Sequence, residues 1–167
     1  HNVYGPGQSL WDSYRNVLGI WMARNLRGLP LLVYGDGLQH RAFSFIDDIL
    51  PCLWQAAVSP VASRQIINLG GEFPVSIVDA AELTVAAMGG GGIEFVDARH
   101  EVSRAWCTTA KSEALLDFRH RTHLDAGIER MWVWAKQIWE QFPNRREKQG
   151  IKIELDRGLY SYWREAV

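Results

Sequence analysis

The sequence predicts a mixed α/β fold that is richer in helix than in sheet, with an α+β arrangement as the alternative. Apolar residues recur with the 3.6-residue period of amphipathic helices at about 12–27, 47–58, 77–88, 110–117 and 123–142. Short apolar or alternating stretches, typical of strands, lie between them at 31–34, 42–45, 65–71, 93–96 and 151–155. The 167 residues suffice for one domain with its own core. We expect that domain over residues 1–143 and a polar linker with an aromatic tail over 144–167.

The first third of the chain contains the densest local pattern. Ser9 or Asp12 is a suitable cap for the first helix, and Gly28 is a suitable stop. The apolar run at 31–34 is followed by the turn residues Gly35-Asp36-Gly37 and a second strand pattern at 42–45. These signals predict a hairpin with Arg41 between its strands, followed by a helix capped by Asp47 or Asp48.

The remaining elements follow from similar signals. The apolar run at 65–71 predicts a buried strand, and Ser76 with Asp79 three residues later predicts a helix start. Four glycines from Gly89 end that helix, because glycine readily adopts positive φ at a helix terminus. Thr122 with Asp125 is a second capping pair and opens the longest helix.

Composition excludes several classes of function. The formal net charge of −1 provides no field that attracts nucleic acid or an anionic membrane. No apolar run approaches the roughly 18 residues that span a bilayer. The two cysteines, Cys52 and Cys107, match no metal or redox spacing, so a reduced, cytoplasmic setting is expected. The sequence therefore predicts no nucleic-acid partner and no membrane association.

No self-contained catalytic motif is present in the sequence. It contains no G-x-G-x-x-G after a strand, no P-loop, no G-x-S-x-G and no H-E-x-x-H. His120 and His123 have metal-like spacing without a further ligand in sequence, so no metal site is predicted. Arg41 and Arg99 remain as possible phosphate ligands, because the planar guanidinium donates paired hydrogen bonds to phosphate oxygens.

Several segments, in order, resemble the extended short-chain dehydrogenase/reductase family of NAD-dependent nucleotide-sugar epimerases and dehydratases, including those like UDP-glucose 4-epimerase. The segments are Asn2-Val3-Tyr4-Gly5-Pro6, the stretch from Arg27 to Asp48 with its Tyr34-Gly35-Asp36-Gly37 turn, Asn68-Leu69-Gly70, Arg99-His100-Glu101-Val102, Ala110-Lys111 and Thr122-His123-Leu124-Asp125-Ala126-Gly127-Ile128. The resemblance covers roughly residues 1–142. One departure is that His100 directly precedes Glu101, which makes that segment one residue shorter than the family's pattern.

The resemblance implies roles in binding a nucleotide-diphosphate sugar. Asn2 would lie near the phosphates, Val17 and Leu18 near the nucleotide, and Leu32, Val33 and Tyr34 beside the base. Arg41 and Arg99 would hold the diphosphate from two sides, and Glu101 would accept a hydrogen bond from the ribose.

The resemblance also implies what this chain lacks. The family's Rossmann half carries the glycine-rich NAD turn and the catalytic Tyr-x-x-x-Lys, and no tyrosine here is followed four positions later by lysine. We therefore expect the substrate-binding part of an enzyme that uses NAD when complete, with no catalytic residue and no cofactor bound by this chain alone. Apolar surface left by the missing half would favour homo-oligomers or self-association. A stand-alone non-catalytic binding module, and a purely structural helical domain, remain as alternatives.

Overall fold

The computed structural model describes residues 2–12 and 16–143, so the predicted strand at 151–155 and the linker and tail over 144–167 lie outside the described residues. The helices are α1 (Val17–Leu26), α2 (Ile46–Val58), α3 (Ile77–Met88), α4 (Ala110–Leu116) and α5 (Leu124–Gln141), with a short 3-10 turn, η1 (Pro60–Ala62), after α2. The strands are β1 (Val3–Tyr4), β2 (Leu31–Tyr34), β3 (His40–Ala42), β4 (Ser44–Phe45), β5 (Pro74–Ser76), β6 (Ile93–Val96) and β7 (Arg104–Ala105). The chain is thus mixed α/β, as predicted.

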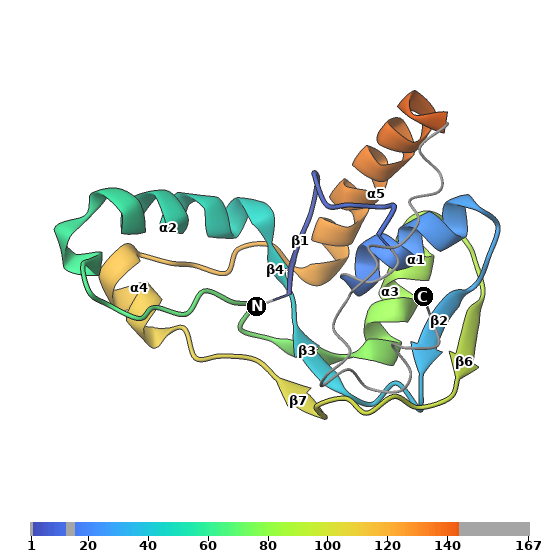
Figure 1. Ribbon diagram of the computed structural model, residues 1–167, viewed down its shortest axis with the longest axis horizontal. Helices are drawn as coiled ribbons and strands as arrows, with labels where there is room; N and C mark the ends of the chain where they lie inside the picture. The colour runs from blue at the N-terminus through green and yellow to red at the C-terminus, as the bar shows by residue number, and fades with distance from the viewer. Residues whose placement is uncertain (1, 13–15, 144–167) are drawn as a thin grey trace, which may run out of the picture.

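Helices α1, α3 and α5 pack against one another and form the main core with the strands beside them (Figure 1). The apolar stripe predicted for the longest helix is inside this core, where Ile128, Met131 and Ala135 are fully buried. A smaller cluster joins α2 to α4 through Ile49, Cys52, Leu116 and Phe118. Figure 1 shows α2 and α4 side by side, at the opposite end of the molecule from α1.

The predicted hairpin at 31–45 is wrong, because its two strands join different sheets. β2 pairs in parallel with β6, so that Leu31 lies opposite Ile93 and Tyr34 opposite Val96. β3 instead lies between β5, which is antiparallel to it, and β7, which is parallel to it. β4 pairs in parallel with β1. The turn at 35–37 forms as expected, with the backbone N–H of Leu38 bonded to the Asp36 carboxylate at 3.0 Å, but pairing with distant segments prevails over local pairing.

One predicted strand is absent from the structure, and one strand was not predicted. Residues 65–71 form an irregular segment instead of a strand, and Gly71 docks on the junction of β3 and β4. Its backbone N–H donates to the Ser44 hydroxyl oxygen at 2.8 Å, which replaces a strand hydrogen bond with a side-chain one. The segment after β6 contains the two-residue strand β7, which the sequence did not indicate.

Helix stops and one start agree with the sequence signals. The Ser76 hydroxyl accepts a hydrogen bond from the Asp79 backbone N–H at 3.1 Å and caps α3, as predicted. Gly89 ends that helix in the left-handed conformation, with φ of 75°. Gly28, with φ of 72°, follows α1 in the same way.

Three predicted N-caps are wrong. α1 begins at Val17 behind Asn16, so neither Ser9 nor Asp12 caps it. α2 begins one residue before Asp47, and the Asp48 carboxylate bonds the backbone N–H groups of Arg121 and Thr122, at 3.1 and 2.9 Å. The Thr122 hydroxyl donates to the same carboxylate instead of capping α5. Asp48 therefore ties α2 to the loop before α5, a tertiary use that outweighs local capping.

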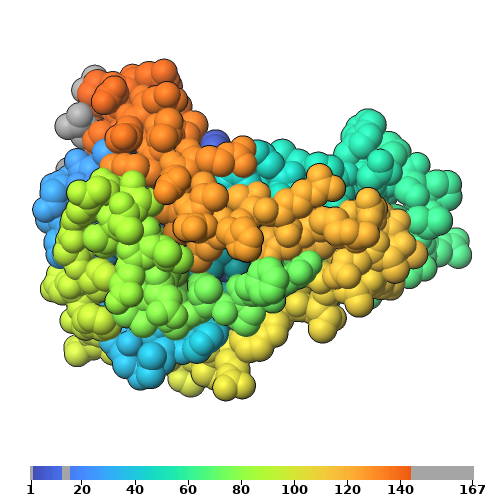
Figure 2. All heavy atoms as spheres, turned by 180° about the vertical axis from the view of Figure 1, so that it is seen from behind, coloured from blue at the N-terminus to red at the C-terminus, as the bar shows by residue number. Residues whose placement is uncertain are grey.

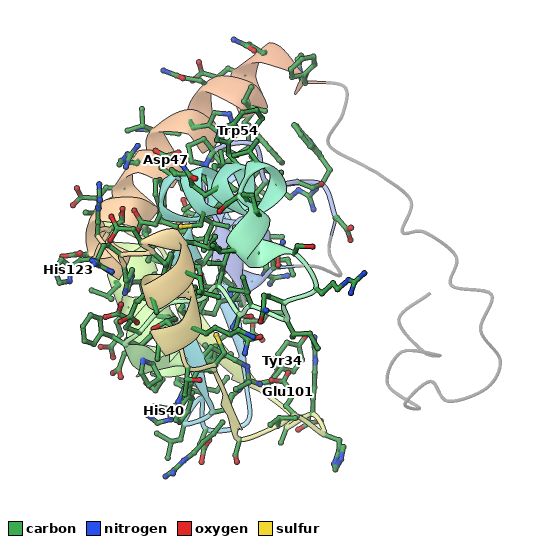
Figure 3. All side chains as sticks on the ribbon, turned by 90° about the vertical axis from the view of Figure 1, so that its left-hand side faces the viewer. Tyr34, His40, Asp47, Trp54, Glu101 and His123 are labelled. Carbon is green, nitrogen blue, oxygen red and sulfur yellow. The ribbon has the colours of Figure 1, made fainter. Side chains whose placement is uncertain are left out.

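One face of α2 is exposed. Of Ile49, Leu50, Leu53, Trp54 and Ala57, only Ile49 is buried, because α4 covers the side of the helix that carries Ile49 and Cys52. Trp54 is 67% exposed, and Figure 3 shows it on α2. We call this surface the α2 apolar face, which consists of Leu50, Leu53, Trp54, Ala57 and Val58. Figure 2 shows that α2 projects at one end of the molecule.

Tyr4 is a titratable residue within the main core, and only 3% of it is exposed. Its ring makes edge contacts with Phe43 and Phe45, and its hydroxyl donates to the backbone carbonyl of Leu124 at 3.5 Å. Burial, followed by the negative charges of Asp48 and Asp125, raises the pKa of the Tyr4 hydroxyl well above its ordinary value. The nearby Arg130 opposes this shift to a smaller extent.

We expect the Tyr4 shift to make stability depend on pH under alkaline conditions. Because the pKa is higher in the folded chain, this contribution is complete below the unfolded value of about 10 and is lost as pH rises above it. Tyr4→Phe should flatten the fall in the urea midpoint between about pH 9 and pH 11. Phe43→Leu, which alters the core beside Tyr4 without removing a titratable group, is the control and should retain the wild-type slope. Equal slopes in all three proteins would contradict the assignment to Tyr4.

Candidate functional site

The candidate site forms where the segment after β6 crosses the ends of β2 and β3. Tyr34 is the last residue of β2, and the guanidinium of Arg99 lies over its ring, with 3.1 Å from the guanidinium carbon to the ring centroid. This is a close cation–π arrangement, in which the ring face attracts the cation. The contact holds residue 99 of the crossing segment against β2.

Arg41 lies on β3, the central strand of its sheet. Side chains alternate across a strand, so Arg41 lies on the face opposite the fully buried Ala42. Its side chain is only 15% exposed. Its Nη1 donates to the backbone carbonyl of His40 at 2.8 Å, and its Nη2 lies 3.3 Å from Oε2 of Glu101. Glu101 is two residues beyond Arg99, so the same segment contacts both β2 and β3.

The structure therefore pairs four of the residues singled out from the sequence, Tyr34 with Arg99 and Arg41 with Glu101, through one segment that contacts both strands. Figure 3 shows Tyr34 and Glu101 close together on one edge of the molecule. Asn2 is connected to this group through β3, because its side-chain amide donates to the backbone carbonyl of Ala42 at 3.1 Å. Arg41 on β3, and Arg99 stacked on the last residue of β2, are two cations suited to an anionic ligand.

The other four candidate residues support this site from behind or lie beside it. Leu18 and Val33 are 1% and 0% exposed, so their side chains belong to the core and only their backbone atoms remain for a ligand. The backbone carbonyl of Leu32 accepts a hydrogen bond from the Trp21 indole at 2.8 Å. Val17 is half-buried in the first turn of α1, one turn before Trp21. The hydrogen bond from Trp21 to Leu32 fixes α1 relative to β2.

The Arg41–Glu101 ion pair is a feature that the sequence did not indicate. The two residues are 60 positions apart, and the sequence assigned them to different parts of a ligand. The pairing depends on the path of the segment after β6, which no local signal predicts. The structure also contains a hollow of about 310 Å³ that the sequence did not indicate. It is lined by Gly7, Gln8, Ser9, Trp11, Trp134, Ile138 and Phe142.

The described part of the chain contains no group of three or more histidine, cysteine or acidic side chains placed to hold a metal ion. His120 instead accepts a hydrogen bond from the Glu72 backbone N–H at 3.3 Å. None of the helices in residues 2–12 and 16–143 is both long enough and apolar enough to cross a bilayer.

The fold matches that of solved sugar-nucleotide epimerases. It superimposes on epimerase Mth375 from Methanothermobacter thermautotrophicus with a TM-score of 0.79, at 27% identity, covering 85% of this chain and 43% of that one. It also matches UDP-glucuronic acid 4-epimerase from Bacillus cereus, solved in complex with UDP-glucuronic acid and NAD, with a TM-score of 0.72 at 27% identity over 81% of this chain and 43% of the other. The class is therefore that of the sugar-nucleotide epimerase fold.

Sequence comparison supports one family within this class. Residues 1–70 match the NAD dependent epimerase/dehydratase family. The chain is 31% identical over 144 residues to dTDP-L-rhamnose 4-epimerase of Burkholderia thailandensis, covering 81% of this chain and 38% of that protein. It is 31% identical over 147 residues to UDP-glucuronic acid decarboxylase 1 of Xenopus tropicalis, covering 86% and 34%. The chain thus spans about two fifths of the length of the relatives it matches.

Proposed function

We propose that this chain is the nucleotide-sugar-binding, C-terminal part of an NAD-dependent epimerase, dehydratase or related enzyme, with residues 1–143 as the binding domain. The observation that carries the proposal is the gathering of Arg41, Arg99, Tyr34 and Glu101 at one site. Relatives that act on UDP-sugars and dTDP-sugars support this ligand class.

In this proposal the chain binds the substrate, and residues outside the chain carry out the chemical steps. Arg41 and Arg99 hold the diphosphate, and Tyr34 lies beside the base, while Asn2 supports the strand that carries Arg41. Val17, Leu18, Leu32 and Val33 form the wall behind the nucleotide. Binding energy of this kind orients the sugar, whose hydride transfer to and from NAD requires residues outside this chain.

The proposal also gives the α2 apolar face a role. A contiguous exposed apolar surface on a folded chain indicates a partner. We infer that in the complete enzyme this face packs on the part of the protein that binds NAD. The relatives are about twice as long as the chain, which leaves room for such a part.

Arg41→Ala tests the proposed site directly. Calorimetric titration of the chain with UDP-glucuronic acid and with dTDP-glucose should show binding of at least one, and the substitution should weaken it by about tenfold or more. That factor corresponds to the loss of one charge-assisted hydrogen bond to phosphate.

Lys136→Ala is the charge-matched control, because Lys136 is exposed on α5, beside Trp132 and away from β3. This variant should bind as the wild type does. If the Arg41→Ala variant binds with the affinity of the wild type, Arg41 does not contact the ligand. If UDP-, dTDP-, GDP- and CDP-sugars all fail to bind at millimolar concentration, the function itself is refuted.

A further inference from the structure

The charge of Arg41 is already matched in the absence of any ligand. The Arg41 side chain is 15% exposed, and a cation withdrawn from water to this extent requires a counter-charge. Glu101 supplies that charge at 3.3 Å, through a single oxygen. Nη1 already donates to the His40 carbonyl, so Nη2 is the terminal nitrogen at which an anion pairs with Arg41, and Glu101 takes that position.

We propose that Glu101 is a built-in competitor of the ligand, which occupies the anion position at Arg41 until a diphosphate displaces it. The inference rests on the proposed function and specifies how the same site selects its ligand. Glu101 lowers the affinity for every anion, so that only a ligand with a high charge, such as a nucleoside diphosphate, exchanges with it effectively.

The geometry makes Glu101 the partner that moves. Arg41 is anchored, because its strand is flanked on both sides and its Nη1 donates to the His40 carbonyl at 2.8 Å. Glu101 is 35% exposed and belongs to an irregular segment, so its carboxylate reaches water by rotation of its own side chain. The ion pair is also longer than the 2.7–2.9 Å of a strong charge-assisted bond, which favours exchange.

The contact between Arg99 and Tyr34 keeps this exchange local. The Arg99 guanidinium lies on the Tyr34 ring two residues before Glu101, so the backbone of the segment stays against β2 when the carboxylate leaves. Release of Glu101 therefore opens Arg41 without moving Arg99.

Two roles of Glu101 predict opposite results for Glu101→Gln. If the carboxylate accepts a hydrogen bond from ribose, the amide should weaken the binding of a nucleotide and leave inorganic pyrophosphate unaffected. If the carboxylate competes at Arg41, the amide should strengthen the binding of both. The expected gain is about two- to fivefold, the range for an exposed ion pair, and it should shrink at high salt.

The experiment is calorimetric titration of the whole chain and its Glu101→Gln variant with UDP and with pyrophosphate, at low and high salt. Glu94→Gln is the matched control, since Glu94 is an exposed carboxylate on β6, and it should bind as the wild type does. Tighter binding of both ligands by Glu101→Gln alone supports the inference. Unchanged or weaker binding overturns it while leaving the proposed function intact.

A second readout does not depend on nucleotide binding. Phenylglyoxal modifies accessible arginine, and mass spectrometry of the peptide that contains Arg41 reports the rate at this residue. The Glu101→Gln variant should react faster at Arg41 than the wild type, and an equal rate overturns the pairing. If neither protein binds UDP or pyrophosphate at millimolar concentration, the competitor role fails, and the titrations with UDP-, dTDP-, GDP- and CDP-sugars decide separately on the proposed function.

Discussion

Gly71→Ala is expected to destabilise the chain by about 3 kcal/mol or more, near the upper end of the effects of overpacking. A Cβ at this position would overlap the backbone carbonyl of Phe43, and it would also lie 3.0 Å from the carbonyl carbon and 3.2 Å from the amide nitrogen of that residue. These are backbone atoms at the junction of β3 and β4, so no side-chain rotation relieves the clash. Any backbone shift that relieved the clash would break the Gly71–Ser44 hydrogen bond at 2.8 Å.

The measurement is the free energy of unfolding from urea titration, followed by far-ultraviolet circular dichroism. Gly92→Ala is the matched control, because its new Cβ would lie 3.6 Å from Pro30, an ordinary contact distance, and its φ is not positive. That variant should change stability by less than about 1 kcal/mol. A Gly71→Ala protein as stable as Gly92→Ala would show that residues 65–71 do not dock on the sheet as described.

The α2 apolar face is expected to make the chain associate with itself. Leu53 and Trp54 are 52% and 67% exposed at the centre of this face. Water contact with so much apolar surface is unfavourable, by about 25 cal/mol for each Å² left uncovered. In the absence of another cover, two copies reduce that exposure by pairing their α2 faces, and sedimentation velocity should detect the dimer or larger species.

A Leu53→Lys, Trp54→Lys double variant should sediment as a monomer with unchanged helix content. Val133→Lys is the control, because Val133 is an apolar residue on α5 that is 54% exposed outside this face. It should leave the association as in the wild type. A compact wild-type monomer at all concentrations would argue against the α2 face as an association surface.

Local features of this fold were predictable from the sequence, and tertiary ones were not. The capping of α3 by Ser76 and its stop at Gly89 depend on residues within a few positions of each other, and both predictions are confirmed. The hairpin failed because β2 and β3 each had a better partner farther along the chain. Asp48 failed as a cap for the same reason, since its carboxylate is used by a loop more than 70 positions away.

The candidate site follows the same division. Arg41, Arg99, Tyr34 and Glu101 were identified from residue type and from resemblance, and the structure places them together. Their pairing was not predictable, because it depends on how one irregular segment crosses two strands. The burial of Val33 and Leu18 could not be predicted either, because an apolar side chain suits the wall of a ligand site as well as a core.

The strand pairing has a consequence for how the chain folds. Every strand pair in the described residues joins positions more than 30 apart, and three of the four pairs are parallel. Closing such long loops costs entropy before any pairing energy is gained, so the sheets contribute a slow, late step to folding. The hydrogen bonds within helices α1, α3 and α5 are local and form without closing such loops, and the packing of these helices brings the strand segments near one another. The candidate site, which joins β2 and β3 of two different sheets, is then among the last parts of the molecule to form.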